Sequence, residues 1–310
     1  MEHYVTLFDS LFVPQGLALH SSMERHLASY TLWVLCVDTP TYEGLSRLAL
    51  PNVKLLQLSS LETENLLRVK SSRTKGEYCW TLTPHAPRFV FEADTSVVRV
   101  TYLDADVWFR KSPDPLLAEL TESGKEVLIT DHAYAPEHDQ SATSGQFCVQ
   151  FLTFNRVGGE EVRSRWEQQC IEWCFARHED GKFGDQKYLD DWPERYRDKV
   201  HVLKNTEATL APWNATRFPY GNGVLFHFHG LRILSDCHLD LGGYYLPKPL
   251  LQNVYAPYLT DLKKAFRQTQ ILGINPSFQS RPRIATRLRH LLTRLHRPFE
   301  SLVRERIVRW

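Results

Sequence analysis

Residues 97–106 read Val-Val-Arg-Val-Thr-Tyr-Leu-Asp-Ala-Asp, and the first six of them form the strongest strand pattern in the chain. β-Branched and aromatic side chains favour extended backbone. Two carboxylates, Asp104 and Asp106, follow the run directly. In open α/β sheets, ligands bind at the carboxyl ends of the strands. The sequence therefore predicts that this acidic pair lies at the ligand-binding edge of a sheet.

The segments before this strand alternate between strand and helix patterns. We expect strands at 5–8, 31–37 and 53–58. A loop containing Pro14 and Gly16 is expected after the first strand, followed by a helix with an apolar stripe over 19–30, and a short helix is expected over 42–48. Strands that alternate with helices predict a parallel sheet covered on both faces. The expected fold class is therefore α/β, with a mainly parallel central sheet flanked by helices.

The rest of the chain continues this pattern and then changes in composition. Further elements are expected as follows: a mainly polar segment, partly loop, at 59–75, an aromatic-rich helix at 77–91 interrupted near Pro84 and Pro87, strands at 127–130, 147–154 and 224–229, and a helix at 160–177. After Pro276 the sequence becomes rich in Arg, Leu and His. We expect a catalytic domain over residues 1–275 and a separate tail over residues 276–310.

The overall composition excludes several classes of protein. Net charge is +1, with 43% hydrophobic and 24% charged residues, which is typical of a globular protein and not of a nucleic-acid-binding one. The six cysteines are scattered, form no Cys-x-x-Cys pair and are expected as buried thiols. The sequence shows neither an export signal nor an apolar run of about 20 residues, so we expect a cytoplasmic protein.

Residues 281–310, called here the basic tail, hold nine arginines against two glutamates, a net charge of +7. Ile284, Leu288, Leu291 and Leu295 form a helical apolar stripe, and a second stripe follows from Phe299 to Trp310. An amphipathic helix with an Arg-rich face can lie on an anionic membrane surface. We expect peripheral contact with the inner face of the cytoplasmic membrane. The alternatives are packing on the protein's own domain or on a second copy in a homo-oligomer.

Two carboxylates separated by one residue can converge on one divalent cation, which can neutralise the diphosphate of a nucleotide sugar. His227 and His229 stand two apart near the end of a later strand and therefore share a face. Imidazole beside carboxylates suits Mn²⁺ better than Mg²⁺. The sequence thus predicts a metal site that joins Asp104 and Asp106 with one of these histidines.

Other interpretations of the acidic pair remain open. It can be a solvated turn at a strand end. Haloacid-dehalogenase-like phosphatases also carry Asp-x-Asp after a strand, and Gly184-Asp185 with Asp190 imitates their later acidic motif, although the segment before Gly184 is too polar for the required strand. A non-catalytic nucleotide-sugar-binding protein on the same fold is the third alternative.

Five segments give the chain a resemblance to glycosyltransferases of the GT-A fold. They are Val5-Thr6-Leu7 with Gly16 and Ser21-Ser22, Trp80-Thr81-Leu82-Thr83, Tyr102-Leu103-Asp104-Ala105-Asp106, Asp185-Gln186, and His227-Phe228-His229-Gly230. The order and spacing resemble the retaining family 8 group, which includes glycogenin and bacterial lipopolysaccharide galactosyltransferases. The chain is also similar to a set of bacterial proteins known only as glycosyltransferases. The resemblance implies transfer from a nucleotide sugar, UDP-linked, to a glycan or glycolipid, with Mn²⁺ or Mg²⁺ as cofactor and a role in lipopolysaccharide or cell-surface glycan synthesis.

The resemblance also implies roles for individual residues. Asp104, Asp106 and His227 would hold the metal, and Asp185 and Gln186 would face the reacting sugar. Arg73 competes with Lys75 as a basic donor contact, core packing competes with stacking at Phe12, and a helix N-cap is an alternative role for Asp185. The implied donor contacts are Leu7, Phe8, Asp9, Phe12, Lys75, Asp104, Ala105, Asp106 and Gly230.

The sequence departs from the family pattern at two places. Family 8 members carry Asn-x-Gly where this chain has Cys148-Val149-Gln150, and the Lys-Pro-Trp expected after the histidine motif is replaced by Leu231-Arg232-Ile233. These changes leave the donor sugar and the stereochemistry open. Trp213 and Asn214 are candidates for the acceptor side, with burial in the core as the alternative for the tryptophan.

Overall fold

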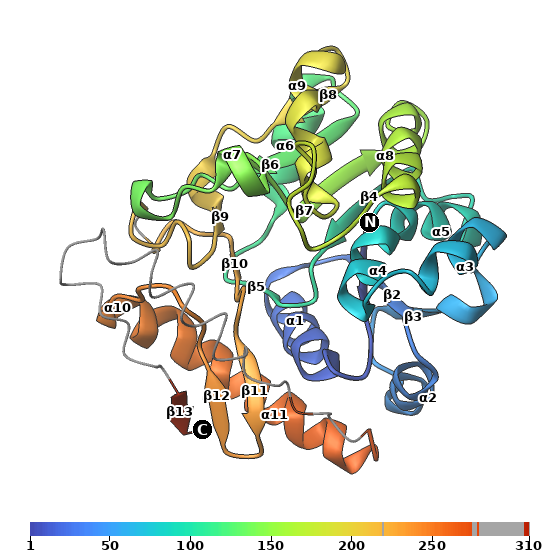
Figure 1. Cartoon of the computed structure of the whole chain (residues 1–310). Helices are drawn as coiled ribbons and strands as arrows, with labels where there is room; N and C mark the ends of the chain where they lie inside the picture. Colours follow the sequence, from blue (N-terminus) through green and yellow to red (C-terminus); the bar gives the residue numbers. More distant parts are fainter. Residues whose placement is uncertain (219, 275–277, 279–306, 310) are drawn as a thin grey trace.

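The computed structural model describes residues 1–218, 220–274, 278 and 307–309 of the 310-residue chain, arranged as in Figure 1. The strands of the main sheet are β1 (Glu2–Phe8), β2 (Tyr30–Cys36), β3 (Val53–Gln57), β4 (Arg99–Leu103), β6 (Val127–Asp131), β7 (Phe147–Asn155) and β8 (Val200–Val202). Their order across the sheet is β3-β2-β1-β4-β7-β6-β8. β3, β2, β1 and β4 run parallel, and β7 is antiparallel to its neighbours β4 and β6. The expected mainly parallel α/β sheet is confirmed.

Helices cover both faces of this sheet. The α-helices of the described residues are α1 (Val13–His26), α2 (Thr39–Leu48), α3 (Glu64–Lys70), α4 (Lys75–Leu82), α5 (His85–Ala93), α6 (Asp114–Ser123), α7 (Ser141–Ser144), α8 (Glu160–Glu172), α9 (Trp192–Arg195), α10 (Lys248–Leu250) and α11 (Ala256–Ile271). Of these, α10 and much of α11 pack with the two small sheets. Alternating residues of β1 show the two layers: Val5 packs in one buried cluster with α5 and α8, and Tyr4 in another with α1 and α6. Both faces of the sheet are therefore buried.

Two small sheets extend the structure beyond β4. β5 (Val107–Phe109), β10 (Leu225–His227) and β9 (Thr209–Leu210) form one, and β11 (Arg232–Ser235), β12 (His238–Asp240) and β13 (Ile307–Arg309) form the other. α11 lies beside β11 and β12 in Figure 1 and packs against α1. None of the described helices is long and apolar enough to cross a membrane.

Several expected boundaries are wrong for identifiable reasons. The first helix begins at Val13, so it includes Pro14 and Gly16, which were expected in a loop, and it ends before Tyr30, which belongs to β2. Proline is tolerated there because the first turn of a helix has no partner for its backbone N–H. Gly16 is required because a Cβ atom at this position would lie 2.4 Å from the Phe8 ring.

The polar segment 59–75 is partly loop, as expected, and also contains helix α3, whose N-terminus is capped by the Thr63 side chain. Two other expectations need correction. Helix α8 ends at Glu172 and does not reach Arg177. The helical stripe expected over 299–310 is wrong at its end, because Ile307–Arg309 forms strand β13, which pairs with β12. The rest of the basic tail, residues 281–306 and 310, lies outside the described residues.

Candidate functional site

The turn between β4 and β5 carries the acidic pair. Asp104 follows the last residue of β4, and its carbonyl accepts a hydrogen bond from the Val107 N–H at 3.2 Å, which turns the chain into β5. β5 pairs antiparallel with β10 in a register that sets His227 opposite Val107. The Phe228 N–H also donates to the Asp106 carbonyl at 2.9 Å. Backbone pairing therefore brings His227 to the acidic turn from 120 residues further along the chain.

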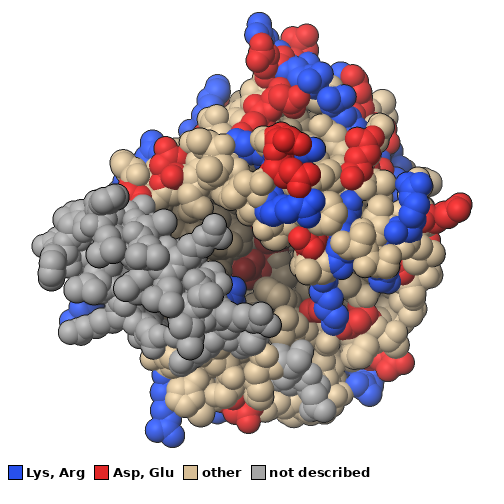
Figure 2. Space-filling view, viewed as in Figure 1, with Lys and Arg blue, Asp and Glu red and all other residues tan. Residues whose placement is uncertain are grey.

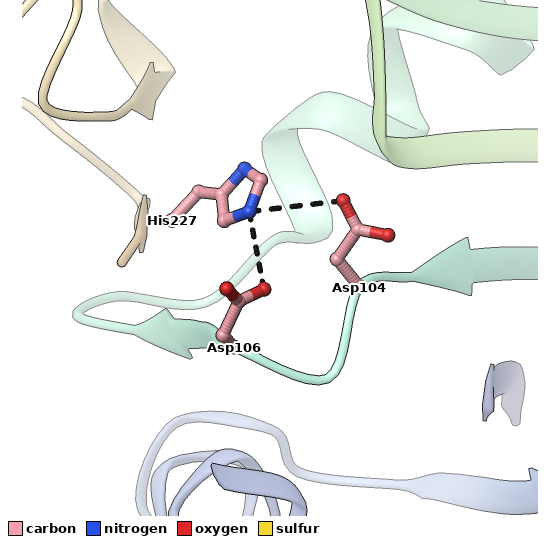
Figure 3. A group of neighbouring side chains, drawn as sticks. All are labelled: Asp104, Asp106 and His227. Atoms are coloured by element: carbon pink, nitrogen blue, oxygen red, sulfur yellow. Dashed lines mark ion pairs between the residues drawn. The ribbon is translucent and has the colours of Figure 1, made fainter. Parts of the chain in front are cut away.

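The side chains of Asp104, Asp106 and His227 converge (Figure 3). His227 Nε2 lies 3.1 Å from Asp106 Oδ1 and 3.8 Å from Asp104 Oδ2, and one ligand atom from each residue lies within 4.8 Å of the other two. The Tyr102 hydroxyl donates to Asp104 Oδ1 at 3.0 Å and orients that carboxylate. Figure 2 shows a hollow on this face of the molecule with acidic side chains inside it. Two carboxylates and one imidazole are a suitable donor set for a divalent cation.

The charges at this site depend on one another. Burial raises the pKa of Asp104 to about 6, with His227 lowering it and Asp106 raising it. Burial would also raise the pKa of Asp106, but the charge and hydrogen bond of His227 lower it below its ordinary value. Burial would lower the pKa of His227, but the two carboxylates hold it well above 6.5. The two carboxylates therefore favour the charged imidazolium form of His227, whose Nε2 lies beside both of them.

Asp185 lies in the segment that precedes the 3₁₀ helix η3 (Gln186–Asp191). Its carbonyl accepts a hydrogen bond of 2.8 Å from Trp166 Nε1, and its side chain is buried with Oδ2 lacking a partner among the described residues. Burial raises the pKa of this carboxyl to about 7; a Thr83 hydrogen bond lowers it and the charge of Asp104 raises it. Asp185 occupies the N-cap position of η3, as the alternative expected, but its side chain makes no capping hydrogen bond there. Gln186 Nε2 donates to the Ser144 carbonyl at 2.7 Å.

The residues expected at the nucleotide lie at the end of β1, the strand next to β4. Leu7 and Phe8 are buried on opposite faces of the sheet. Asp9 Oδ1 accepts from the Leu11 N–H at 3.0 Å, and its Oδ2 lies 3.6 Å from Lys75 Nζ. Phe12 packs partly buried against the cluster that holds Phe8.

Lys75 and Arg73, the two candidates for the basic donor contact, differ in burial and in their partners. Arg73 is buried, and its guanidinium donates to the Thr81 hydroxyl and to the Ile171 carbonyl. Lys75 has 85% of its side chain exposed and faces Asp9. Lys75 therefore remains the candidate for a donor contact, and Arg73 belongs to the packing of α4 against α8.

The remaining expected residues occupy structural positions around the site. Ala105, between the two acidic residues of the turn, is buried in the hydrophobic core. Gly230 has φ +81°, which a residue with a Cβ atom rarely adopts, and it lies close to Gly242. Trp213 is buried with its ring 5.3 Å from that of His227, and Asn214 is fully buried with hydrogen bonds to backbone groups. Burial in the core, the alternative stated for Trp213, is observed.

Two contacts of the site were not expected from the sequence. Gln150 Oε1 lies 3.0 Å from His227 Nδ1, and Thr83 hydrogen-bonds Asp185. The only signal for Gln150 was the departure of its segment from the family pattern, and that departure did not indicate a contact with His227.

Comparison with known proteins finds uncharacterized relatives by sequence and a known fold by structure. No family model matches the sequence. The chain is 28% identical over 285 residues to the uncharacterized protein YfnD of Bacillus subtilis (strain 168), covering 86% of this chain and 91% of YfnD. It is 27% identical over 250 residues to the uncharacterized protein YfnF of the same organism, covering 75% of this chain and 82% of YfnF.

Among solved structures, the apo-form glycosyltransferase GlyE of Streptococcus pneumoniae TIGR4 superposes with a TM-score of 0.51 at 14% identity, covering 86% of this chain and 64% of that one. The chain has a GT-A fold. In this GT-A chain the Asp104, Asp106 and His227 group lies at the carboxyl end of the central strand β4, where the sequence predicted a ligand site.

Proposed function

We propose that this protein is a metal-dependent glycosyltransferase that moves a sugar from a UDP-linked donor to a glycan or glycolipid acceptor with retention of configuration. The observation that carries the proposal is the convergence of Asp104, Asp106 and His227 at the carboxyl end of β4 in a GT-A fold. A site of this charge and position suits the diphosphate of a nucleotide sugar.

The residues present fit a divalent cation. Asp104 and Asp106 supply carboxylate oxygens, His227 supplies Nε2, and the three donors already lie within 4.8 Å of one another. A mixed oxygen and nitrogen set favours Mn²⁺ over Mg²⁺. When bound, the cation supplies positive charge to the departing diphosphate.

The neighbouring strand offers a place for the nucleotide. β1 and β4 are adjacent and parallel, so residues 7–12 and the acidic turn lie at the same edge of the sheet. Asp9 can accept a hydrogen bond from a uracil N–H, because among the described residues its Oδ2 pairs only with the exposed Lys75. Lys75 is exposed and can turn from Asp9 to a phosphate.

Asp185 and Gln186 would act on the sugar side of the metal group. A buried carboxyl with a pKa of about 7 can accept a hydrogen bond from an acceptor hydroxyl or stabilise positive charge at the anomeric carbon. We assign it no nucleophilic role, because retention by a front-face mechanism needs no covalent intermediate. Gln186 holds the Ser144 carbonyl and so fixes the position of Asp185 relative to α7.

The phosphatase alternative is not favoured by the geometry. It requires Asp190 to join the acidic pair, but Asp190 accepts from the Gln146 N–H at 2.8 Å and pairs with Lys187 Nζ at 2.7 Å. Asp185 is presented by a turn and not by a strand. Docking of the basic tail on an anionic membrane stays a prediction from the sequence.

The proposal is tested by incubating the protein with a panel of nucleotide sugars and Mn²⁺ and measuring release of the nucleoside diphosphate. We expect turnover of at least one UDP-sugar, reduced at least a hundredfold in Asp104→Asn and Asp106→Asn. Asp198→Asn, an exposed aspartate outside the site, is the matched control and should keep full activity. Turnover that is equal in all variants would contradict the proposal.

A further inference from the structure

The segment in which this chain departs from the family 8 pattern faces the metal group. Cys148 and Gln150 lie two residues apart on β7 and therefore share one face of the strand. Both are buried, Gln150 completely. The Cys148 thiol contacts His227, and the Gln150 side chain reaches the same imidazole. A carboxamide buried in the centre of a sheet needs a specific partner, because burial of an unpaired amide is costly.

Gln150 contacts both segments that supply the metal group, the end of β4 and the strand that carries His227. Its side-chain Oε1 lies 3.0 Å from His227 Nδ1, and its backbone carbonyl accepts from the Asp104 N–H at 3.4 Å. The end of β4 and the strand that carries His227 are thus both held by one residue of β7.

The orientation of the carboxamide decides what His227 can bind. With Oε1 toward the ring, Nδ1 must carry a proton, so a neutral imidazole keeps the lone pair on Nε2, which faces Asp104 and Asp106. With the amide reversed, its N–H would need a lone pair on Nδ1. The proton of the neutral ring would then lie on Nε2, between the carboxylates, where it would exclude a cation.

We propose that Gln150 is a positioning residue for the metal, which fixes His227 with its proton on Nδ1 and the lone pair of Nε2 directed at the space between Asp104 and Asp106. Partners of this kind on the second nitrogen of a ligand histidine typically change metal affinity by about 10–100-fold. The inference rests on the proposed metal site and goes beyond it in naming the residue that orients the histidine.

The unpaired end of the carboxamide supports a functional role. Gln150 Nε2 is buried and has no hydrogen-bond partner among the described residues. An apolar side chain of similar size would avoid the cost of this buried unsatisfied donor. Core packing alone therefore does not explain a glutamine at this position, whereas a contact with His227 Nδ1 does.

The test compares Mn²⁺ binding by the full chain and three variants, with free Mn²⁺ counted by electron paramagnetic resonance. Gln150→Met keeps the length of the side chain and removes the acceptor, and Gln150→Glu keeps an acceptor. Gln169→Met is the matched control, because Gln169 lies on α8 outside the metal group and its buried amide oxygen has no hydrogen-bond partner among the described residues. We expect Gln150→Met to weaken Mn²⁺ binding by about 10–100-fold. Gln150→Glu should stay within about threefold of the parent chain and Gln169→Met should not change.

A second measurement does not depend on folding of a variant. In the unmodified chain with ¹⁵N-labelled histidine, Cd²⁺ as a diamagnetic probe should shift the Nε2 resonance of His227 and leave the proton on Nδ1. Equal Mn²⁺ affinity in Gln150→Met, or loss of the Nδ1 proton on Cd²⁺ binding, would overturn the inference and leave the proposed function intact. Failure of the unmodified chain to bind Mn²⁺ at all would contradict the proposed function itself, together with the inference.

Discussion

His227 Nε2 lies 3.1 Å from Asp106 Oδ1 and 3.8 Å from Asp104 Oδ2, so the imidazole occupies the place between the two carboxylates where a cation would bind. The carboxylates hold the pKa of His227 well above 6.5, although burial opposes them. A metal and the proton on Nε2 therefore compete for the same atoms.

This competition predicts that Mn²⁺ binding releases a proton near pH 7. Below the pKa of His227 the affinity should fall by up to about tenfold for each unit that the pH decreases, because the proton must leave first. Isothermal titration in two buffers of different ionisation enthalpy measures the number of protons released. A value close to one is expected, and a value of zero would show that His227 is not a ligand.

The raised pKa of Asp185 predicts that the stability of the metal-free protein depends on pH. Burial raises the pKa of its folded form from 3.8 to about 7, so its contribution to stability is complete below about pH 4 and is lost as the pH rises through 7. Asp185→Asn has no proton to lose. The free energy of unfolding of the variant, relative to the parent chain, should therefore increase between pH 4 and pH 8, by up to roughly 4 kcal/mol.

Chemical denaturation at both pH values in the presence of EDTA measures this difference. A difference between Asp185→Asn and the parent chain that does not change with pH would show that the carboxyl has an ordinary pKa in the folded protein.

The close packing of Gly16 against Phe8 predicts that a larger side chain at position 16, next to the expected nucleotide pocket, destabilises the protein. A Cβ atom at this position would lie 2.4 Å from the Phe8 ring, so Gly16→Ala should lower the free energy of unfolding by about 1–3 kcal/mol. Gly76→Ala is the matched control in helix α4, because a Cβ atom there meets nothing within 4 Å. The control should stabilise the protein slightly, by about 0.5–1 kcal/mol. Thermal unfolding of both variants checks the contrast, and equal effects would contradict it.

We predict that substitution of Lys75 weakens binding of the donor without changing the stability of the protein. Its side chain is exposed and lies 3.6 Å from Asp9, so an ion pair there contributes little to stability. Lys75→Met should raise the KM for the nucleotide sugar severalfold while kcat changes little. Lys54→Met, which removes an equivalent exposed pair with Asp94, is the control. An unchanged KM for Lys75→Met would remove Lys75 from the donor site.

The sequence predicted six of the seven strands of the main sheet, because each is a run rich in apolar residues; the three-residue strand β8 (Val200–Val202) was not predicted. Asp104 and Asp106 could be placed at the sheet edge from the strand that precedes them. Helix boundaries were less predictable: Gly16 looked like a loop residue, and its helical position depends on contact with Phe8, which is a tertiary effect. The apolar spacing of Ile307 and Trp310 was interpreted as helical, whereas Ile307–Arg309 pairs with β12.

The sequence predicted which residues form the metal group, but not which residues hold them in position. Residue type and strand position indicated that His227 or His229 is a ligand, and the resemblance to family 8 singled out His227. The contact between Gln150 and His227 joins β7 to β10 across 77 residues, and no local pattern encodes such a pairing. The same holds for Thr83 and Asp185, which meet only because α4 and the segment before η3 pack on one face of the sheet.

The central claim is that Asp104, Asp106 and His227 bind a divalent cation together with a nucleoside diphosphate. Isothermal titration of the unmodified chain with UDP, with and without Mn²⁺, tests it most directly. We expect measurable UDP binding that requires Mn²⁺ and disappears in Asp106→Asn. UDP binding of the same affinity without metal, or no binding under either condition, would contradict the account.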